Sequence, residues 1–409
     1  MATRYYVGAA KKVAQVDTIT PGGTIAATDT FSVIINGKTL TFTATTTTVA
    51  HVVTGLYNLW IASEEPEFQE IAPTDSTTTL TLTARTPGKP FTVTASVSNV
   101  SGGAAPTLTQ ATTTSASGPS FYTTAANWSG SSTPTTGDTA IIEGDYEILY
   151  GLDDNSTTLA KMVIRDFSGR IGLPPVNPDG NYPEYREQYL KVSATILDIL
   201  ENVTSSRIRI NVGSNATTTT VLSSGASDVA TIRAVTIKGT HADNIFNIIG
   251  GEVGIATEAS ETATVKTLRV GGGSVQPQVD VGDGTTLTTV VLNSGTLNCY
   301  ADFTTGTING GTLNLIDDPD IGGTLTIRGA PAVVKGGPTI AKVVVVDGGV
   351  LDLSQDSRTL TITDCDVYSG ATILDGFGRV TWTNAIVKKE CDFDDLDLQL
   401  GHGKSVSFA

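Results

Sequence analysis

The residues of this sequence with the clearest potential for chemistry are its aspartates. Two carboxyl groups at a fixed separation can hydrolyse a glycosidic bond, one as general acid and the other as nucleophile or base. Three groups of aspartates could supply such a pair: Asp317, Asp318 and Asp320; Asp364 and Asp366; and the run Asp392–Asp397. None of them has the neighbouring Trp, Tyr and Arg of a sugar cleft. We therefore expect that the chain is not an enzyme, and a polysaccharide-degrading hydrolase or lyase remains an alternative.

Calcium is the one metal for which the sequence offers candidates. Asp317, Asp318 and Asp320 form an oxygen-rich turn, but the full twelve-residue loop with its terminal bidentate Glu is missing. Solvated turn carboxylates are the simpler interpretation. Zinc is not expected, because histidine and cysteine are scarce. We expect no cofactor and keep these three aspartates as weak calcium candidates.

The histidines and cysteines do not form a recognisable catalytic pattern. His51, His241 and His402 lie far apart and in different expected elements, and no nucleophile elbow accompanies them. The three cysteines, Cys299, Cys365 and Cys391, are too few and odd in number for a disulfide framework. We expect the cysteines to be reduced and to face inward as small apolar residues.

A repeat dominates the C-terminal half and must position any site there. Glycines at 273, 295, 311, 329, 349 and 370 precede short apolar–polar alternations, at intervals of 22, 16, 18, 20 and 21 residues. A period near twenty suits one coil of a parallel β-helix, in which each coil buries its apolar face only by stacking on its neighbours. Residues 121–409 are therefore predicted to form a right-handed parallel β-helix with Trp128 in its end cap. Val275, Leu297, Leu313 and Leu351 are predicted to point inward.

Residues 15–99 are predicted to form a small α+β module with the order β-β-α-β-β. Phe31, Val33 and Ile35 alternate with polar residues, and Asn36-Gly37 is a strong hairpin signal. An apolar stripe from Val49 to Trp60 has helical spacing. Leu80 and Leu82, a Pro87-Gly88 turn, and Phe91, Val93 and Ala95 predict a second hairpin.

Three segments around these units are predicted to be irregular. Residues 1–14 are expected to form an N-terminal arm, either frayed or strapped onto a neighbouring subunit, with Arg4, Tyr5, Tyr6 and Val7 as interface candidates. Residues 100–120 are rich in Ser, Thr and Gly and are expected to be a linker. A Pro- and Tyr-rich stretch, 174–190, is expected to be a loop insertion in the β-helix. Its Tyr182, Tyr185 and Tyr189 are interface candidates that could stack on sugars.

Composition limits the classes of function. The formal net charge is −16, which argues against a nucleic-acid surface. No apolar stretch is long enough to cross a membrane, and no secretory signal follows Lys11-Lys12. We expect neither nucleic acid nor membrane as a partner, and assembly in a cytoplasm.

Parts of the sequence resemble structural proteins of tailed-phage and prophage particles. Residues Asp29–Thr45 and Thr79–Val97 are similar to a module that recurs in phage tail and head proteins. The segment 169–270 resembles phage virion proteins, through pieces such as Tyr182–Arg186 and Gly251–Ala256. The resemblance implies location in a virion and no particular chemistry.

This resemblance suggests a capsid decoration (cement) or head-fibre protein that attaches through its N-terminal part and projects the β-helix. The implied partners are the major capsid protein or other virion proteins, and the implied assembly is a homotrimer. The alternative within the same class is a tail fibre or spike that binds a host surface glycan.

Overall fold

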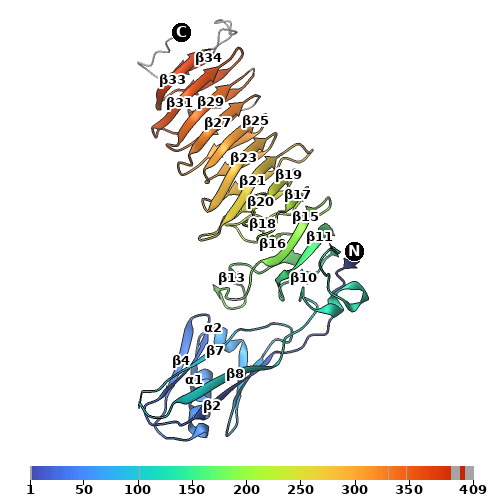
Figure 1. Ribbon diagram of the computed structural model, residues 1–409, viewed down its shortest axis with the longest axis vertical. Helices are drawn as coiled ribbons and strands as arrows, with labels where there is room; N and C mark the ends of the chain where they lie inside the picture. Colours follow the sequence, from blue (N-terminus) through green and yellow to red (C-terminus); the bar gives the residue numbers. More distant parts are fainter. Residues whose placement is uncertain (1, 101, 330, 347, 388–396, 401–409) are drawn as a thin grey trace.

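Stacked coils of β-strand form most of the molecule, and a smaller module lies at their N-terminal end (Figure 1). The structure is a computed structural model that describes residues 2–100, 102–329, 331–346, 348–387 and 397–400. Asp392, Asp394, Asp395, Cys391 and His402 lie outside the described residues, so the expectations for them are not addressed.

Each coil contributes a strand to each of two parallel faces, and each strand pairs with its counterpart in the next coil. One face contains β9 (Thr139–Gly144), β11 (Asp153–Phe167), β15 (Leu190–Ile199), β17 (Thr218–Val221), β19 (Ile245–Ile248), β21 (Ala263–Val270), β23 (Thr285–Leu292), β25 (Phe303–Ile308), β27 (Ile321–Ile327), β29 (Thr339–Val345), β31 (Leu360–Val367) and β33 (Val380–Val387). The other contains β10 (Glu147–Ile148), β12 (Arg170–Ile171), β16 (Arg207–Asn211), β18 (Val235–Lys238), β20 (Glu252–Ile255), β22 (Gln278–Val281), β24 (Thr296–Cys299), β26 (Thr312–Leu315), β28 (Pro331–Val334), β30 (Val350–Asp352), β32 (Thr372–Asp375) and β34 (Asp397–Leu400). The molecule is therefore mainly β, as expected, and its parallel sheets close into a solenoid.

Register explains why the coils stack. Leu297 pairs with Leu313, which pairs with Ala332, and this column continues to Leu351 and Ile373. All five side chains are buried in one continuous apolar cluster. Because side chains alternate across a strand, a slip of one residue would turn this column outward. Burying each leucine stabilises the fold by about 1.5–3 kcal/mol.

The expectation for Val275 is wrong, because its side chain is 56% exposed. Gly271 and Gly272 adopt positive φ and extend the turn before this coil, so β22 starts only at Gln278. The inward position of the coil belongs to Val279, which pairs with Leu297. Gly273 correctly predicted a turn, but this turn has more residues than expected, so the inward-facing position falls at Val279 and not at Val275.

The N-terminal residues are not an arm. β1 (Thr3–Tyr5) adds to the solenoid by parallel pairing with β9, Thr3 opposite Thr139. Tyr6 is 2% exposed and packs edge to face on Trp128, and its hydroxyl donates a hydrogen bond to the Pro119 carbonyl at 2.6 Å. Tyr6 is therefore buried within its own chain, at the end where the first coil would otherwise expose its interior, whereas Tyr5 and Val7 stay exposed.

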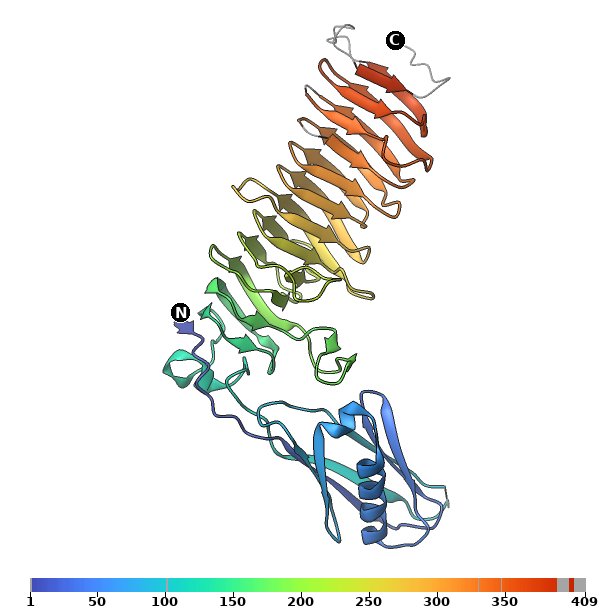
Figure 2. The ribbon, with the colours of Figure 1, turned by 180° about the vertical axis from the view of Figure 1, so that it is seen from behind.

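Two antiparallel sheets and a helix make up the N-terminal module (Figure 2). One sheet has the order β5 (Ile71–Asp75), β6 (Leu80–Ala84), β2 (Val16–Gly23), β8 (Pro106–Thr114), and the other has the order β4 (Lys38–Thr43), β3 (Thr30–Ile35), β7 (Thr94–Ser98). The helix α1 (Val49–Ala62) buries its predicted stripe, and Trp60 donates a hydrogen bond to the Phe68 carbonyl in the short helix α2 (Pro66–Gln69).

The first predicted hairpin and the helix match β3, β4 and α1, whereas the second hairpin is wrong. β6 pairs with β2 and β5, and β7 pairs with β3 in the other sheet. The residues between them, including buried Phe91 and Val93, cross from one sheet to the other. The expected linker 100–120 contains β8, which pairs with β2 along its length because its threonines suit a strand.

We expect the substitution Leu297→Asp to reduce the free energy of unfolding by about 3–5 kcal/mol, because it places an unpaired charge in the solenoid interior. Thermal unfolding followed by circular dichroism would measure the change. Thr288→Asp, at an exposed position of β23, is the control and should unfold like the wild type. Equal melting temperatures for the two variants would contradict the inward register.

We expect Tyr6→Ala to cost about 3–5 kcal/mol of stability, because it empties a buried aromatic position beside Trp128. The matched control is Tyr5→Ala, whose side chain is 37% exposed. Limited proteolysis of the N-terminal residues would report the same difference. A Tyr6→Ala variant that melts and resists protease like Tyr5→Ala would show that the N-terminal strand does not close the solenoid.

Candidate functional site: the junction loop

The loop insertion at residues 174–190, here called the junction loop, joins the solenoid to the N-terminal module. It leaves the solenoid after β12, forms the short antiparallel pair β13 (Val176–Asn177) and β14 (Tyr182–Pro183), and returns at β15. Tyr182 and Tyr189 are each 3% exposed. The expectation that these tyrosines offer free faces to a sugar or a partner is therefore wrong for Tyr182 and Tyr189, whereas Tyr185 is only partly buried.

Glu70 of the module is the centre of the outer contact of this loop. The Arg186 guanidinium lies 3.0 Å from one Glu70 oxygen and 3.2 Å from the other, and the Tyr182 hydroxyl donates to the same carboxylate. The Lys89 ammonium bridges Glu70 at 2.7 Å and Asp179 of the loop at 3.1 Å. Both contacts of Arg186 come from one nitrogen, Nη2, and charge-assisted hydrogen bonds of this kind are stronger than those between neutral groups.

Further contacts hold the loop rigid around Arg186. Its Nε donates to Glu184 at 2.8 Å, and Asn177 donates to the other Glu184 oxygen at 2.8 Å. The guanidinium lies 4.6 Å from the centre of the Tyr185 ring, which stacks on Tyr182. Burial alone would lower the pKa of Arg186, but Tyr185 and the Glu184 and Glu70 carboxylates outweigh it and raise this pKa. The arginine therefore stays charged at this buried position.

The β3–β4 turn makes a second contact with the loop. The Asn36 side-chain amide donates to the Pro183 carbonyl at 3.1 Å and to Glu67 at 3.0 Å. Lys38 lies 2.9 Å from the buried Glu67 carboxylate. Asn36-Gly37 thus forms the predicted hairpin turn, and Asn36 also contacts the junction loop at Pro183. The sequence did not predict this second contact.

Tyr189 anchors the inner end of the loop on the solenoid. Arg209 lies 4.2 Å and Lys238 3.8 Å from the centre of its ring. Each cation also has an acidic partner, with Arg209 at 2.6 Å from Glu258 and Lys238 at 2.9 Å from Glu261. Burial raises the pKa of the Tyr189 hydroxyl, so the ring remains neutral and serves as a face for the cations.

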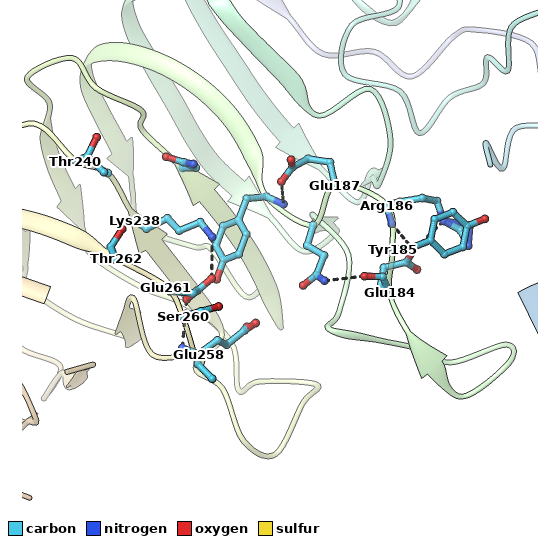
Figure 3. Close-up of a pocket in the computed structure, with 15 residues that line it drawn as sticks. Glu184, Tyr185, Arg186, Glu187, Lys238, Thr240, Glu258, Ser260, Glu261 and Thr262 are labelled. Atoms are coloured by element: carbon cyan, nitrogen blue, oxygen red, sulfur yellow. Dashed lines mark hydrogen bonds and ion pairs between the residues drawn. The ribbon is translucent and has the colours of Figure 1, made fainter. Parts of the chain in front are cut away.

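A polar cavity of about 650 Å³ lies between this end of the loop and the solenoid. Figure 3 shows Lys238, Glu258 and Glu261 on one side and the segment Glu184–Glu187 on the other. Four carboxylates line it, Glu184, Glu187, Glu258 and Glu261, and each has a cationic partner among the described residues. These ion pairs fix the positions of the carboxylates that line the cavity, and burial raises the pKa of Glu258 although Arg209 lies beside it.

The aspartates singled out in the sequence lie elsewhere and serve the coil corners. Asp318 accepts a hydrogen bond from the Gly337 amide at 2.5 Å, and Asp320 accepts one from the Thr339 amide at 2.8 Å. Within the described residues, no group of three or more His, Cys, Asp or Glu side chains is arranged to hold a metal. Among the calcium candidates, Asp318 and Asp320 therefore bond to the next coil, whereas Asp317 lies exposed at the corner after β26.

The remaining candidates are also apart from one another. Asp366 pairs with Lys342 at 2.8 Å, and Asp364 accepts from Asn384 at 2.9 Å. His51 contacts the Thr45 hydroxyl at 2.9 Å on α1, and His241 accepts from the Asp243 amide in a solenoid turn. The interface candidates Arg4, Tyr5, Tyr6 and Val7 belong to the solenoid cap. Glu70 and Lys89 were missed, because a single Glu and a single Lys give no signal in a sequence.

Comparisons with known proteins add no assignment: no family model, no curated protein and no solved structure matches the chain. No helix among the described residues is both long and apolar enough to cross a bilayer.

We expect Glu70→Ala to loosen the junction and to reduce stability by about 1–3 kcal/mol, because Arg186 and Lys89 lose a buried partner while Arg186 keeps Glu184. Small-angle scattering should show a broader distribution of long intramolecular distances. Glu64→Ala, at an exposed position nearby, is the control. Identical scattering and melting for both variants would contradict the role of Glu70.

Proposed function

We propose that the chain is a structural protein of a tailed-phage particle, of the capsid decoration or head-fibre type, in which a β-helix, expected to be right-handed, projects from an attached N-terminal part. The observation that supports this most is the junction loop. It holds the module to one end of a stacked solenoid through buried ion pairs at Glu70 and a cation-flanked Tyr189. A fixed angle between an attachment module and a stiff rod is what a projecting protein needs.

The N-terminal module is the part proposed to contact the particle. Tyr6 is buried within the solenoid cap and β1 pairs with β9, so the N-terminal residues are not proposed as the strap. The module instead presents exposed apolar side chains, Ile61 in the last turn of α1 and Val100 after β7. The proposed partners are the major capsid protein or other virion proteins.

Virion location and a homotrimeric state belong to the same proposal. The high negative charge suits a particle surface that must stay dispersed. Homo-oligomers with closed symmetry are the common arrangement for such proteins. Light scattering on the purified chain should give three times the chain mass of 42.4 kDa.

Immunogold labelling of tailed-phage particles from a strain that carries the gene would test this function directly. Label on the head supports a decoration or head-fibre role. Label on tail fibres favours the alternative, a fibre or spike that binds a host glycan, and absence of label from intact particles would contradict a virion role. In parallel, release of reducing ends from host polysaccharide would support the enzyme alternative.

We expect Ile61→Asp to abolish attachment of the purified chain to particles that lack it, with an unchanged melting temperature because the side chain is 55% exposed. Cosedimentation with the particles would measure attachment. The control is Phe377→Asp, an exposed apolar position on the solenoid. Equal cosedimentation of both variants would place the attachment surface outside α1.

A further inference from the structure

A second hollow, here called the side groove, lies on the solenoid and is lined by no residue of the junction loop. Its volume is about 340 Å³, and its lining includes Arg233, Asp280, Asp283, Tyr300 and Asp317. A neighbouring hollow of about 360 Å³ shares Arg233 and Asp280 with it. The loop between β17 and β18 forms one wall, and the corners that follow β22, β24 and β26 form the other. Small-molecule sites in proteins are concave and of this size.

Arg233 and Asp280 make the floor of the side groove rigid. The guanidinium contacts both Asp280 oxygens, at 2.5 and 3.0 Å, and donates to Gln278 at 3.1 Å. Asn298 donates to Asp280 at 2.8 Å, and Asn314 on the next coil donates to Asn298 at 2.8 Å. These contacts hold Arg233 and Asp280 at fixed positions in the groove, so a ligand would lose little free energy in ordering them.

Tyr300 supplies an aromatic face in the side groove. It follows β24 directly, its amide donates to the Val281 carbonyl at 3.0 Å, and its side chain remains 36% exposed. Partial burial and the nearby Asp280 and Asp317 carboxylates raise the pKa of its hydroxyl, which stays a neutral donor and acceptor. A tyrosine held by its backbone and open on the groove is suited to stack on a flat or apolar face of a ligand.

The charge of the side groove is negative. Arg233 is matched by Asp280, whereas Asp283 and Asp317 have no ion pair within the described part of the chain and are exposed. Asp317 is held at a φ of 61°, in the left-handed region, at the corner after β26. Arg358 acts on Asp317 only at longer range. Two exposed carboxylates beside an aromatic ring attract a cation and repel an acidic ligand.

From these observations we infer that the side groove binds a short oligosaccharide that carries an amino group. The sugar ring stacks on Tyr300, its hydroxyl groups exchange hydrogen bonds with Arg233 and Asp280, and its ammonium group lies near Asp283 and Asp317. The inference does not depend on the virion proposal, because a decoration protein and a fibre could both carry such a groove. If the saccharide inference fails, the virion proposal still stands, and the reverse also holds.

Isothermal titration calorimetry of the full chain at about pH 6, where sugar amines are protonated, would test this site. The probe is a β-1,4-linked glucosamine tetramer. We expect saturable binding to the wild type, about tenfold weaker binding to Tyr300→Ala, and a similar loss in the double variant Asp283→Asn, Asp317→Asn. Phe377→Ala, which removes a 64% exposed aromatic outside the groove, should bind like the wild type.

Two further probes separate the contributions of charge and stacking. Cellotetraose, which has no amine, should bind more weakly than the glucosamine tetramer, and a heparin-derived tetrasaccharide should not bind. Absence of saturable binding to the wild type would overturn the inference, as would equal binding to Tyr300→Ala. Equal affinity for the acidic tetrasaccharide would overturn the role given to Asp283 and Asp317. Because the substituted side chains are at least partly exposed, unchanged melting temperatures should accompany every variant.

Discussion

In-register parallel stacking is the interaction on which the rest of this structure depends. Each coil exposes an apolar edge that only the next coil covers, and columns such as Leu297, Leu313 and Leu351 make the cover continuous. A column of this kind has two ends that must be closed. At the described N-terminal end, β1, Tyr6 and Trp128 close it, so residues that look like a loose terminus belong to the core.

The same stacking explains where side chains are free to act. Inward positions are committed to the core, and many outward polar groups bond to the coil above or below, as Asp280, Asn298 and Asn314 do. Side chains on loops and corners that extend from the stack are therefore freer to take part in a site. The junction loop and the loop between β17 and β18 are two such places. The first is closed by compensated charges, and the second keeps an open groove with an accessible tyrosine.

The two loops point to different uses of one scaffold. In the junction loop, Arg186 pairs with Glu70 of the module and with Glu184, and Arg209 lies over the ring of Tyr189. Such contacts suit a rigid joint between the module and the solenoid. The side groove leaves Asp283 and Asp317 unmatched within the described residues, which suits recognition. The proposed projecting protein, if it also binds a basic saccharide, would use the first loop as a joint and the second as a binding site.

The sequence alone determined the periodic features: the turn glycines, the Asn36-Gly37 hairpin, the stripe of α1 and the inward leucines, since local spacing encodes them. Tertiary structure decided whatever depends on contacts between distant residues. Tyr6 lies opposite Trp128, β6 and β7 belong to different sheets, and Glu70 meets Arg186, although 116 residues separate the last two. The inward register of one coil shifted from Val275 to Val279 because turn length, unlike turn position, has no periodic signal. Whether a tyrosine is buried or a carboxylate is paired depends on its neighbours in space, and these neighbours come together only when the chain folds.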